Sequence, residues 1–268
     1  MRGDVLARGG CKEKKIGAMV RLFIAILTLT LASAFTQARA QDNFGGKLSL
    51  ERLGNVQPGV YVAGDKVHFT LVASGDNFLL RFDDDPEVFV LYTGHASLGG
   101  RILKYDSGET ALQVAGWGGM TLYTDTAPTG LPAVRTGDAT VPAPANVSLP
   151  DIHNAAEDET QHLAYMRGLR INVTVDWPAI IADGVTRAFA FDTMENAVRG
   201  LDRFSYSANG REALAHHVDT MMVEPGNKPT LRLKTRTLIV TFNPARGYEG
   251  RASSRAIARA LGSIFSKR

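Results

Sequence analysis

The sequence has almost no cysteine. The one cysteine among the 268 residues is Cys11, which lies in a leader that we expect to be removed, so the mature protein carries none. Without thiols the mature chain cannot form disulfides, iron–sulfur clusters or thiolate zinc sites. A chain of this kind suits an oxidising compartment, where a stray thiol would mispair. No cysteine follows the apolar part of the leader, so lipid attachment there is not expected.

The chain also lacks an apolar run long enough to cross a bilayer. The longest run, residues 22–35, has about 14 residues, whereas a spanning helix needs roughly 20. Basic residues precede this run, and the small-x-small motif Ala38-Arg39-Ala40 follows it, as in a cleavable signal peptide. We therefore predict a signal peptide over residues 1–40, cleavage before Gln41, a periplasmic or secreted location, and no transmembrane helix after cleavage.

Positive charge is concentrated in this leader. The whole chain has 30 Lys and Arg against 27 Asp and Glu, a net charge of +3. Residues 1–40 hold seven of the basic and two of the acidic residues, which leaves 23 and 25 in the remainder and a net charge near −2. The basic pI therefore does not indicate nucleic-acid binding by the mature protein. Translation could start at Met1 or Met19, and either start leaves a complete signal.

Signatures of common active sites are missing. The chain has no Gly-x-Ser-x-Gly or Ser-x-x-Lys motif for a serine nucleophile. His153 and His162 are nine residues apart, with Glu157 and Asp158 between them, so they do not form the His-Glu-x-x-His motif of a zinc protease. We expect these residues to lie on an exposed helix, with acidic groups complementing its dipole.

Two loops could be mistaken for ligand sites. Asp83-Asp84-Asp85 lacks the alternating pattern of a calcium loop and precedes a proline, so we predict a turn rather than a calcium site. Gly116-Trp117-Gly118-Gly119 opens a strand and has no Lys-Ser/Thr sequel, so it is not a phosphate loop. We predict a tight hairpin with a packed Trp117; the alternative is a tryptophan that stacks on a sugar or lipid headgroup.

Residues 41–126 predict an all-β half. Alternation is clearest where Phe69 and Leu71 are interleaved with His68 and Thr70, which indicates one apolar and one wet face. Turns rich in Gly, Asp and Ser separate the strand-like segments. We predict an antiparallel meander or a sandwich-like arrangement, with strands at residues 59–63, 66–73, 77–82, 87–92, 101–105, 111–115 and 120–124.

Proline marks the end of this half. Five of the eleven prolines lie within residues 127–150, and proline fixes φ and removes a hydrogen-bond donor. We therefore predict a Pro-rich linker or long loop there, without a helix or central strand. Residues 151–268 predict an α+β half with helices packed on a small, mostly antiparallel sheet. Its helices are expected at residues 151–170, 192–204 and 253–265, and its strands at 171–177, 218–223, 230–233 and 237–242.

The last predicted helix has one basic and one apolar face. Arg255 and Arg259 lie opposite an apolar stripe that includes Leu261 and Phe265. Such a helix can lie on an anionic membrane, or it can bury the stripe against its own sheet. We predict that it docks on the sheet of the last three strands and leaves its arginines in water.

His216, His217 and Asp219 form the best cluster for chemistry. On a strand, His217 and Asp219 would share a face and could bind a divalent metal or act as a base with its orienting acid. No third ligand is indicated, so we favour a solvated strand edge and predict no metal, cofactor or catalytic residue.

Two stretches resemble a family of exported bacterial proteins of unknown function. The N-terminal stretch comprises Pro86-Glu87-Val88-Phe89-Val90-Leu91, the segment Gly100-Arg101 to Gly108-Glu109, and Gly118-Gly119 to Thr124 before the Pro-rich segment. The terminal stretch comprises Thr237-Leu238-Ile239-Val240 followed by Pro244, Gly247-Tyr248 and Gly250-Arg251-Ala252-Ser253-Ser254. The resemblance implies an exported protein without a known activity.

Together these patterns favour a non-enzymatic exported protein of α+β fold. It would bind a protein partner or a component of the cell envelope, and no nucleic acid. The alternative is a hydrolase or metal-dependent enzyme that uses His216, His217 and Asp219.

Overall fold

Short turns divide residues 59–137 into eight strands. The computed structural model describes residues 56–266, so the predicted signal peptide lies outside the described residues. Several strand bounds agree with the sequence prediction to the residue, because turn residues flank them on both sides. The strands are β1 (Gly59–Ala63), β2 (Val67–Ser74), β3 (Asn77–Phe82), β4 (Val88–His95), β5 (Arg101–Tyr105), β6 (Thr110–Val114), β7 (Met120–Leu122) and β8 (Leu131–Gly137).

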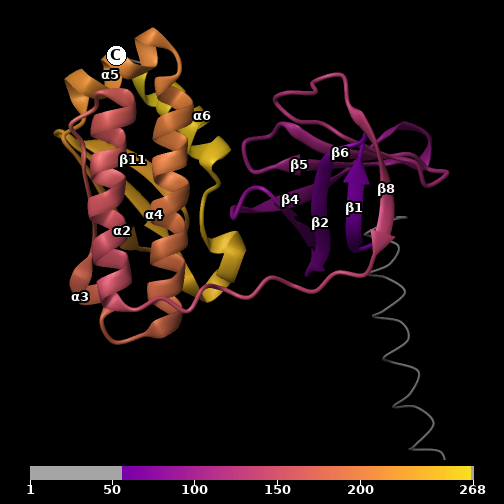
Figure 1. The fold of residues 1–268 in the computed structure, drawn as a ribbon, viewed down its shortest axis with the longest axis horizontal. Helices are drawn as coiled ribbons and strands as arrows, with labels where there is room; N and C mark the ends of the chain where they lie inside the picture. Colours follow the sequence, from indigo (N-terminus) through magenta and orange to yellow (C-terminus); the bar gives the residue numbers. More distant parts are fainter. Residues whose placement is uncertain (1–55, 267–268) are drawn as a thin grey trace, which may run out of the picture. The chain divides into compact units, whose positions relative to one another are not determined.

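These eight strands form a closed antiparallel barrel (Figure 1). Each strand pairs with the next, as in the predicted antiparallel meander, but β8 also pairs with β1, so the arrangement is a closed barrel instead of an open meander or a sandwich. An eight-stranded barrel is just wide enough to be filled by side chains. The inward positions are filled by large apolar groups, including Phe69, Phe78, Phe89, Leu103 and Leu112.

Strand β8 pairs on both sides, which corrects the prediction that residues 127–150 contain no central strand. Its second residue is Pro132, which cannot donate to a ladder. Pro132 lies just beyond the last β1–β8 pair, Ala63 with Ala133, and its carbonyl still accepts the Gly64 N–H at 3.0 Å. The missing donor therefore falls at the end of the β1–β8 ladder, while on the other side Pro132 lies opposite Thr121 in the pairing with β7.

The remaining residues form a layer of helices on a sheet, here called the α/β layer. Its first helix begins at a capping box in which Ser148 and Asp151 bond each other's backbone N–H. A π-helical turn, Leu163–Arg167, ends this helix earlier than predicted. The elements are α2 (Leu149–His162), β9 (Asn172–Val175), α3 (Trp177–Ile180), α4 (Gly184–Ser205), α5 (Ala208–His217), β10 (Thr220–Pro225), β11 (Thr230–Lys234), β12 (Thr237–Phe242) and α6 (Ser254–Phe265), with a 3-10 segment at Pro244–Gly250. A second 3-10 segment, Ser97–Gly99, lies in the barrel between β4 and β5.

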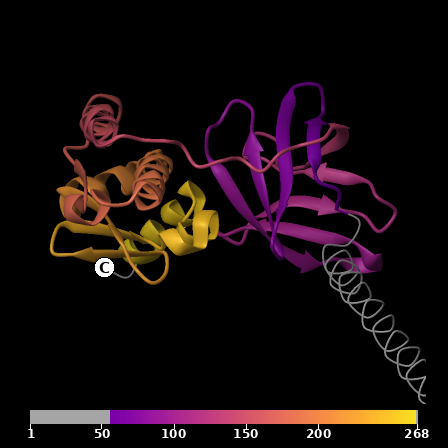
Figure 2. The same ribbon diagram turned by 90° about the horizontal axis from the view of Figure 1, so that it is seen from below.

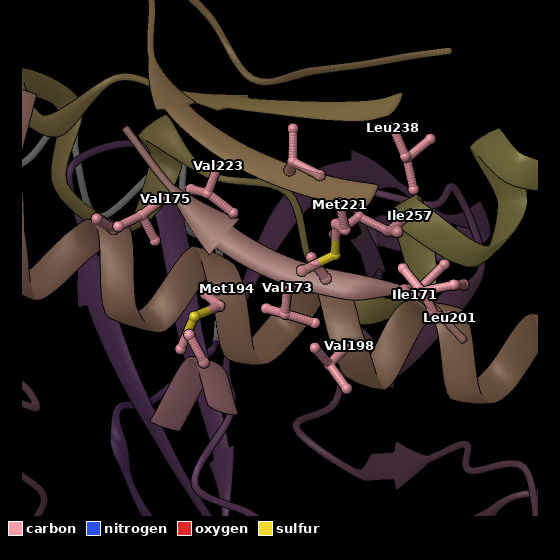
Figure 3. Close-up of a cluster of buried hydrophobic side chains, with 14 of the residues drawn as sticks. Ile171, Val173, Val175, Met194, Val198, Leu201, Met221, Val223, Leu238 and Ile257 are labelled. Atoms are coloured by element: carbon pink, nitrogen blue, oxygen red, sulfur yellow. The ribbon is translucent and has the colours of Figure 1, made fainter. Parts of the chain in front are cut away.

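The sheet of this layer has the order β11-β12-β10-β9. Strand β10 is parallel to both β9 and β12, and only β11 pairs antiparallel, so the prediction of a mostly antiparallel sheet is wrong. The long helical connection from β9 to β10 allows this, since parallel neighbours need a crossover. The helices cover one face of the sheet (Figure 2). Figure 3 shows the core between them, where Val173 and Met221 from the sheet meet Met194 and Val198 from α4.

Helix α6 docks through its apolar stripe, as predicted. Ser253 caps it, and Ile257 and Leu261 are buried. It packs mainly on α4, whereas the prediction named only the sheet. Gly200 makes the approach possible, because a Cβ there would lie 2.5 Å from Ile257 Cγ2. Within residues 56–266 no helix is both long enough and apolar enough to span a bilayer.

Candidate functional site

His216, His217 and Asp219 do not form a site. The two histidines end helix α5 instead of lying on a strand, and β10 begins only at Thr220. His216 lies 3.8 Å from Glu212, and the His217 ring stacks on Phe265. Asp219 forms a two-pronged ion pair with Arg236. The strand-edge prediction is therefore wrong for the histidines, because the helix continues through them.

The other polar clusters have local partners. His153 lies 3.7 Å from Glu157 on α2, and His162 bonds Asp202 of α4 at 2.9 Å. The three aspartates before Pro86 form the predicted turn, with Asp85 accepting the Glu87 N–H at 2.9 Å. Among residues 56–266, no group of three metal-ligating side chains comes together.

At Trp117 the predicted tight hairpin is present, but the predicted packing of the indole is not. The hairpin is tight, since Gly118 N–H bonds Ala115 O at 2.9 Å. The indole, however, is 82% exposed instead of packed. The glycines on both sides leave it no neighbouring side chain in the loop to pack against.

The first group of buried charges joins the barrel to α6. Two barrel carboxylates accept hydrogen bonds from the first turn of this helix: Glu87 from Ser254 N–H and Oγ–H, both at 2.7 Å, and Asp106 from Ser253 N–H at 2.7 Å. Carboxylates are favourable there because a helix N-terminus carries partial positive charge and unpaired N–H groups. We call this group the joint.

Arginines complete the joint. Arg251 is buried, donates to Val88 O at 2.7 Å and forms an ion pair with Asp192. Arg255 bonds Glu109 and Asp125, both at 2.8 Å, and lies over the Tyr105 ring. The prediction that the last helix leaves its arginines in water is therefore wrong for Arg255, and Arg251, just before this helix, is buried too. The barrel carboxylates that pair with them are far away in the sequence, so no local pattern could reveal the pairing.

Glu87 makes the joint sensitive to pH. Burial raises the pKa of its carboxyl to about 7, although the bonds from Ser254 oppose this shift. A raised pKa in the folded state stabilises the fold fully below the unfolded value near 4.5, and this stabilisation is lost as the pH rises through 7. The loss is on the order of 3 kcal/mol, at about 1.4 kcal/mol per pKa unit.

We therefore expect Glu87→Gln to flatten the decline in stability between pH 4.5 and 7. The amide matches the protonated acid, because its oxygen can accept the Ser254 N–H while its NH₂ donates to Ser254 Oγ. Urea unfolding of both proteins at several pH values measures this. Asp84→Asn is the matched control, since Asp84 is exposed. Parallel curves for wild type and Glu87→Gln would contradict the assignment.

A cavity lies next to the joint. The Pro-rich residues 138–148, here called the strap, connect β8 to α2. Tyr248 OH holds the strap by donating to Pro142 O at 3.2 Å, and Arg187 Nε donates to Val147 O at 2.8 Å. Between the strap, α4 and β3–β4 is a cavity of about 320 Å³. Its walls include Arg81, Pro86, Pro142, Pro144, Ala145, Ala188, Phe189, Phe191, Asp192, Glu195, Arg199 and Tyr248.

Two of these groups are carboxylates one helical turn apart. Asp192 and Glu195 lie on α4, and burial raises the pKa of both. Each has its own cation: Asp192 pairs with Arg251, and Glu195 bonds Arg199 at 3.0 Å. Aromatic side chains lie beside them, with the Phe189 and Tyr248 rings edge to face at 5.7 Å.

Arg81 is the remaining charge in the cavity. It lies on β3, is exposed, and has no ion-pair or side-chain hydrogen-bond partner within residues 56–266. It also lines a second cavity, of about 210 Å³, between the strap and the outer face of β1–β3. The cavity beside α4 thus combines paired charges, one unpaired cation and apolar walls, which is a typical composition for a small-ligand site.

The sequence did not reveal these residues. Asp192, Glu195 and Arg199 have ordinary spacing for an exposed helix face, and Arg81 precedes a turn. One signal was present: the stretches that carried the family resemblance contain Glu87, Asp106 and Arg251, which all belong to the joint.

Comparisons with known proteins place the chain in a family. Searches of curated proteins and of solved structures give no significant match. A comparison with models of protein families matches residues 44–261, which include the barrel, the strap and nearly all of the α/β layer, to one described as a domain of unknown function (DUF4908). The match confirms the resemblance to a family of unknown function, while export stays a prediction. Since it covers most of the sequence, the chain belongs to the DUF4908 family.

Proposed function

We propose that this is an exported, non-enzymatic binding protein that holds a small ligand in the cavity beneath the strap. The observation that carries the proposal is this cavity of about 320 Å³, where aromatic walls meet charged groups already held in place by ion pairs. Such preorganised pockets are the usual form of small-molecule sites. Large apolar side chains fill the middle of the barrel, and a further cavity of about 360 Å³ opens at one end of it, beside Tyr61 and Met120.

The arrangement favours binding over catalysis. Both acidic groups in the cavity form ion pairs with arginines, which suits them to hold a fixed charge pattern. Arg251 also links Asp192 to the joint, so the wall of the cavity is tied to the barrel. The alternative enzyme built on His216, His217 and Asp219 has no support, since these residues point to separate partners.

Ligand binding in the cavity is tested by filling it. Ala145 lies on the strap, is exposed and lines the cavity, so Ala145→Trp should fill the space without disturbing the core. A library of small acids, amines and neutral compounds is screened by ¹H–¹⁵N NMR. We expect hits that shift the amides of Phe191 and Tyr248 and disappear in Ala145→Trp.

The matched control is Ala208→Trp, an exposed alanine on α5 that does not line the cavity. Hits should survive in this control. A library that yields no hit at millimolar concentration, or hits that persist in Ala145→Trp, would contradict the proposal.

Export is supported by the basic leader, the short apolar run and the Ala38-Arg39-Ala40 site. Protein recovered from the producing cell should begin at or near Gln41 and should leave the cytoplasm. Full-length chain that remains in the cytoplasm would show that residues 1–40 are no signal peptide.

A further inference from the structure

We infer that the ligand of this cavity carries one anionic group, such as a carboxylate, on an apolar or aromatic body, and that Arg81 binds the anionic group. The inference rests on the proposed function and specifies its ligand class.

The first step is the balance of charge in the cavity. Asp192 is matched by Arg251, and Glu195 by Arg199, so neither carboxylate offers a free negative charge to an amine. Arg81 is left without a partner in the described part of the chain. Counted together with Arg251, which pairs with Asp192 from outside the lining, the cavity has three cations and two carboxylates, so a single anion would neutralise the excess.

The second step is the chemistry of that cation. A guanidinium is planar and binds a carboxylate through two parallel N–H···O bonds, which adds directional preference to the charge attraction. Arg81 lines both cavities beneath the strap, so it stands where they adjoin. An anionic group bound there would leave the rest of the ligand in the larger cavity, beside α4.

The third step is the nature of the walls. Phe189, Phe191 and Tyr248 line the larger cavity, and prolines of the strap face them. These surfaces favour an apolar body and offer aromatic faces and edges for a ring. The volume of about 320 Å³ is at the lower end of the range of about 300–1,000 Å³ for ligand pockets, which favours a compact molecule.

Three probes that differ only in their end group test the inference: 3-phenylpropionate, 3-phenylpropanol and 3-phenylpropylamine. Titration calorimetry of the folded chain should show the acid binding at least tenfold more tightly than the alcohol and the amine. Arg81→Gln should weaken the acid at least tenfold and leave the alcohol unchanged. Arg81→Lys should bind the acid with an affinity between those of the wild type and Arg81→Gln, because a lysine keeps the charge and loses the two-pronged geometry.

Arg211→Gln is the matched control, since Arg211 is an exposed arginine on α5 outside the cavity. It should leave binding of the acid unchanged, and thermal unfolding should confirm that every variant is folded. The proposed ligand class would be overturned if the alcohol or the amine bound as tightly as the acid. It would also be overturned if Arg81→Gln left the affinity for the acid unchanged.

The same experiment separates the two proposals. If the amine or alcohol binds best and Ala145→Trp abolishes this binding, the cavity is a ligand site and only its anion preference is wrong. If the acid binds equally well to wild type and Ala145→Trp, both proposals are wrong.

Discussion

Replacing Leu261 by alanine should lower the free energy of unfolding by about 2–5 kcal/mol. Leu261 is fully buried in the core of the α/β layer, on the stripe that packs against α4. Truncation removes the apolar contacts and leaves a cavity that neighbouring side chains fill only in part. Urea unfolding followed by circular dichroism measures the change.

Leu98→Ala is the control for this prediction. Leu98 is 87% exposed in the loop before β5, so the same chemical change should alter stability by less than about 0.5 kcal/mol. A Leu261→Ala protein as stable as wild type would mean that α6 does not dock. Weaker binding of that protein to anionic vesicles would then favour the membrane-surface alternative.

Arg251→Ala should cost on the order of 3 kcal/mol of stability. The side chain is 1% exposed and has three partners: the Asp192 carboxylate, the Val88 carbonyl and the Tyr248 ring. Removing one member of a buried ion pair costs about 3–5 kcal/mol, because the remaining charge is left without compensation. The lower end applies here, since 26% of the Asp192 side chain is exposed.

A second substitution shows how much of this lost stability comes from the unpaired Asp192 carboxylate and how much from the lost packing of Arg251. Adding Asp192→Asn to Arg251→Ala should restore part of the lost stability, because the uncompensated negative charge disappears. Arg259→Ala, which truncates an exposed arginine of α6, the helix that follows Arg251, should cost little. If the double variant is no more stable than Arg251→Ala, the ion pair is not the source of the effect.

The sequence predicted several strands well, but it placed the start of α4 eight residues too late, at 192 instead of Gly184, and it missed α3 and α5. The bounds of β1, β3, β5 and β12 are correct to the residue because each strand is set by its own pattern and by turn residues at its ends. The cap of α6 at Ser253 follows from the same kind of local chemistry.

Pairing between distant segments was predicted poorly. The role of β8 was missed because Pro132 argues against a strand unless the ladder is known to end there. The parallel order of β9, β10 and β12 depends on which strands meet and not on their own patterns. His216 and His217 were assigned to a strand because the helix α5 before them has a weak apolar pattern.

The candidate site was hidden for the same reason. Glu87 reads as the end of an acidic turn, and Arg251 as one of several arginines in a basic segment. Only their distant partners show that both are buried. A charged residue has the same appearance in sequence whether water or an ion pair surrounds it.

The joint has a consequence for the order of folding. Seven of the barrel pairings connect strands that are neighbours in the sequence, and even the closure of β1 on β8 needs nothing after residue 137. Glu87, in contrast, depends on Ser254, which follows it by 167 residues. A chain growing from its N-terminus can therefore form the barrel early, but the Glu87 carboxylate lacks its donors until 167 further residues have been added. Chains that end before α6 would keep an acid with no donor from this helix, so a segment synthesised long after the barrel completes the bonding of a barrel residue.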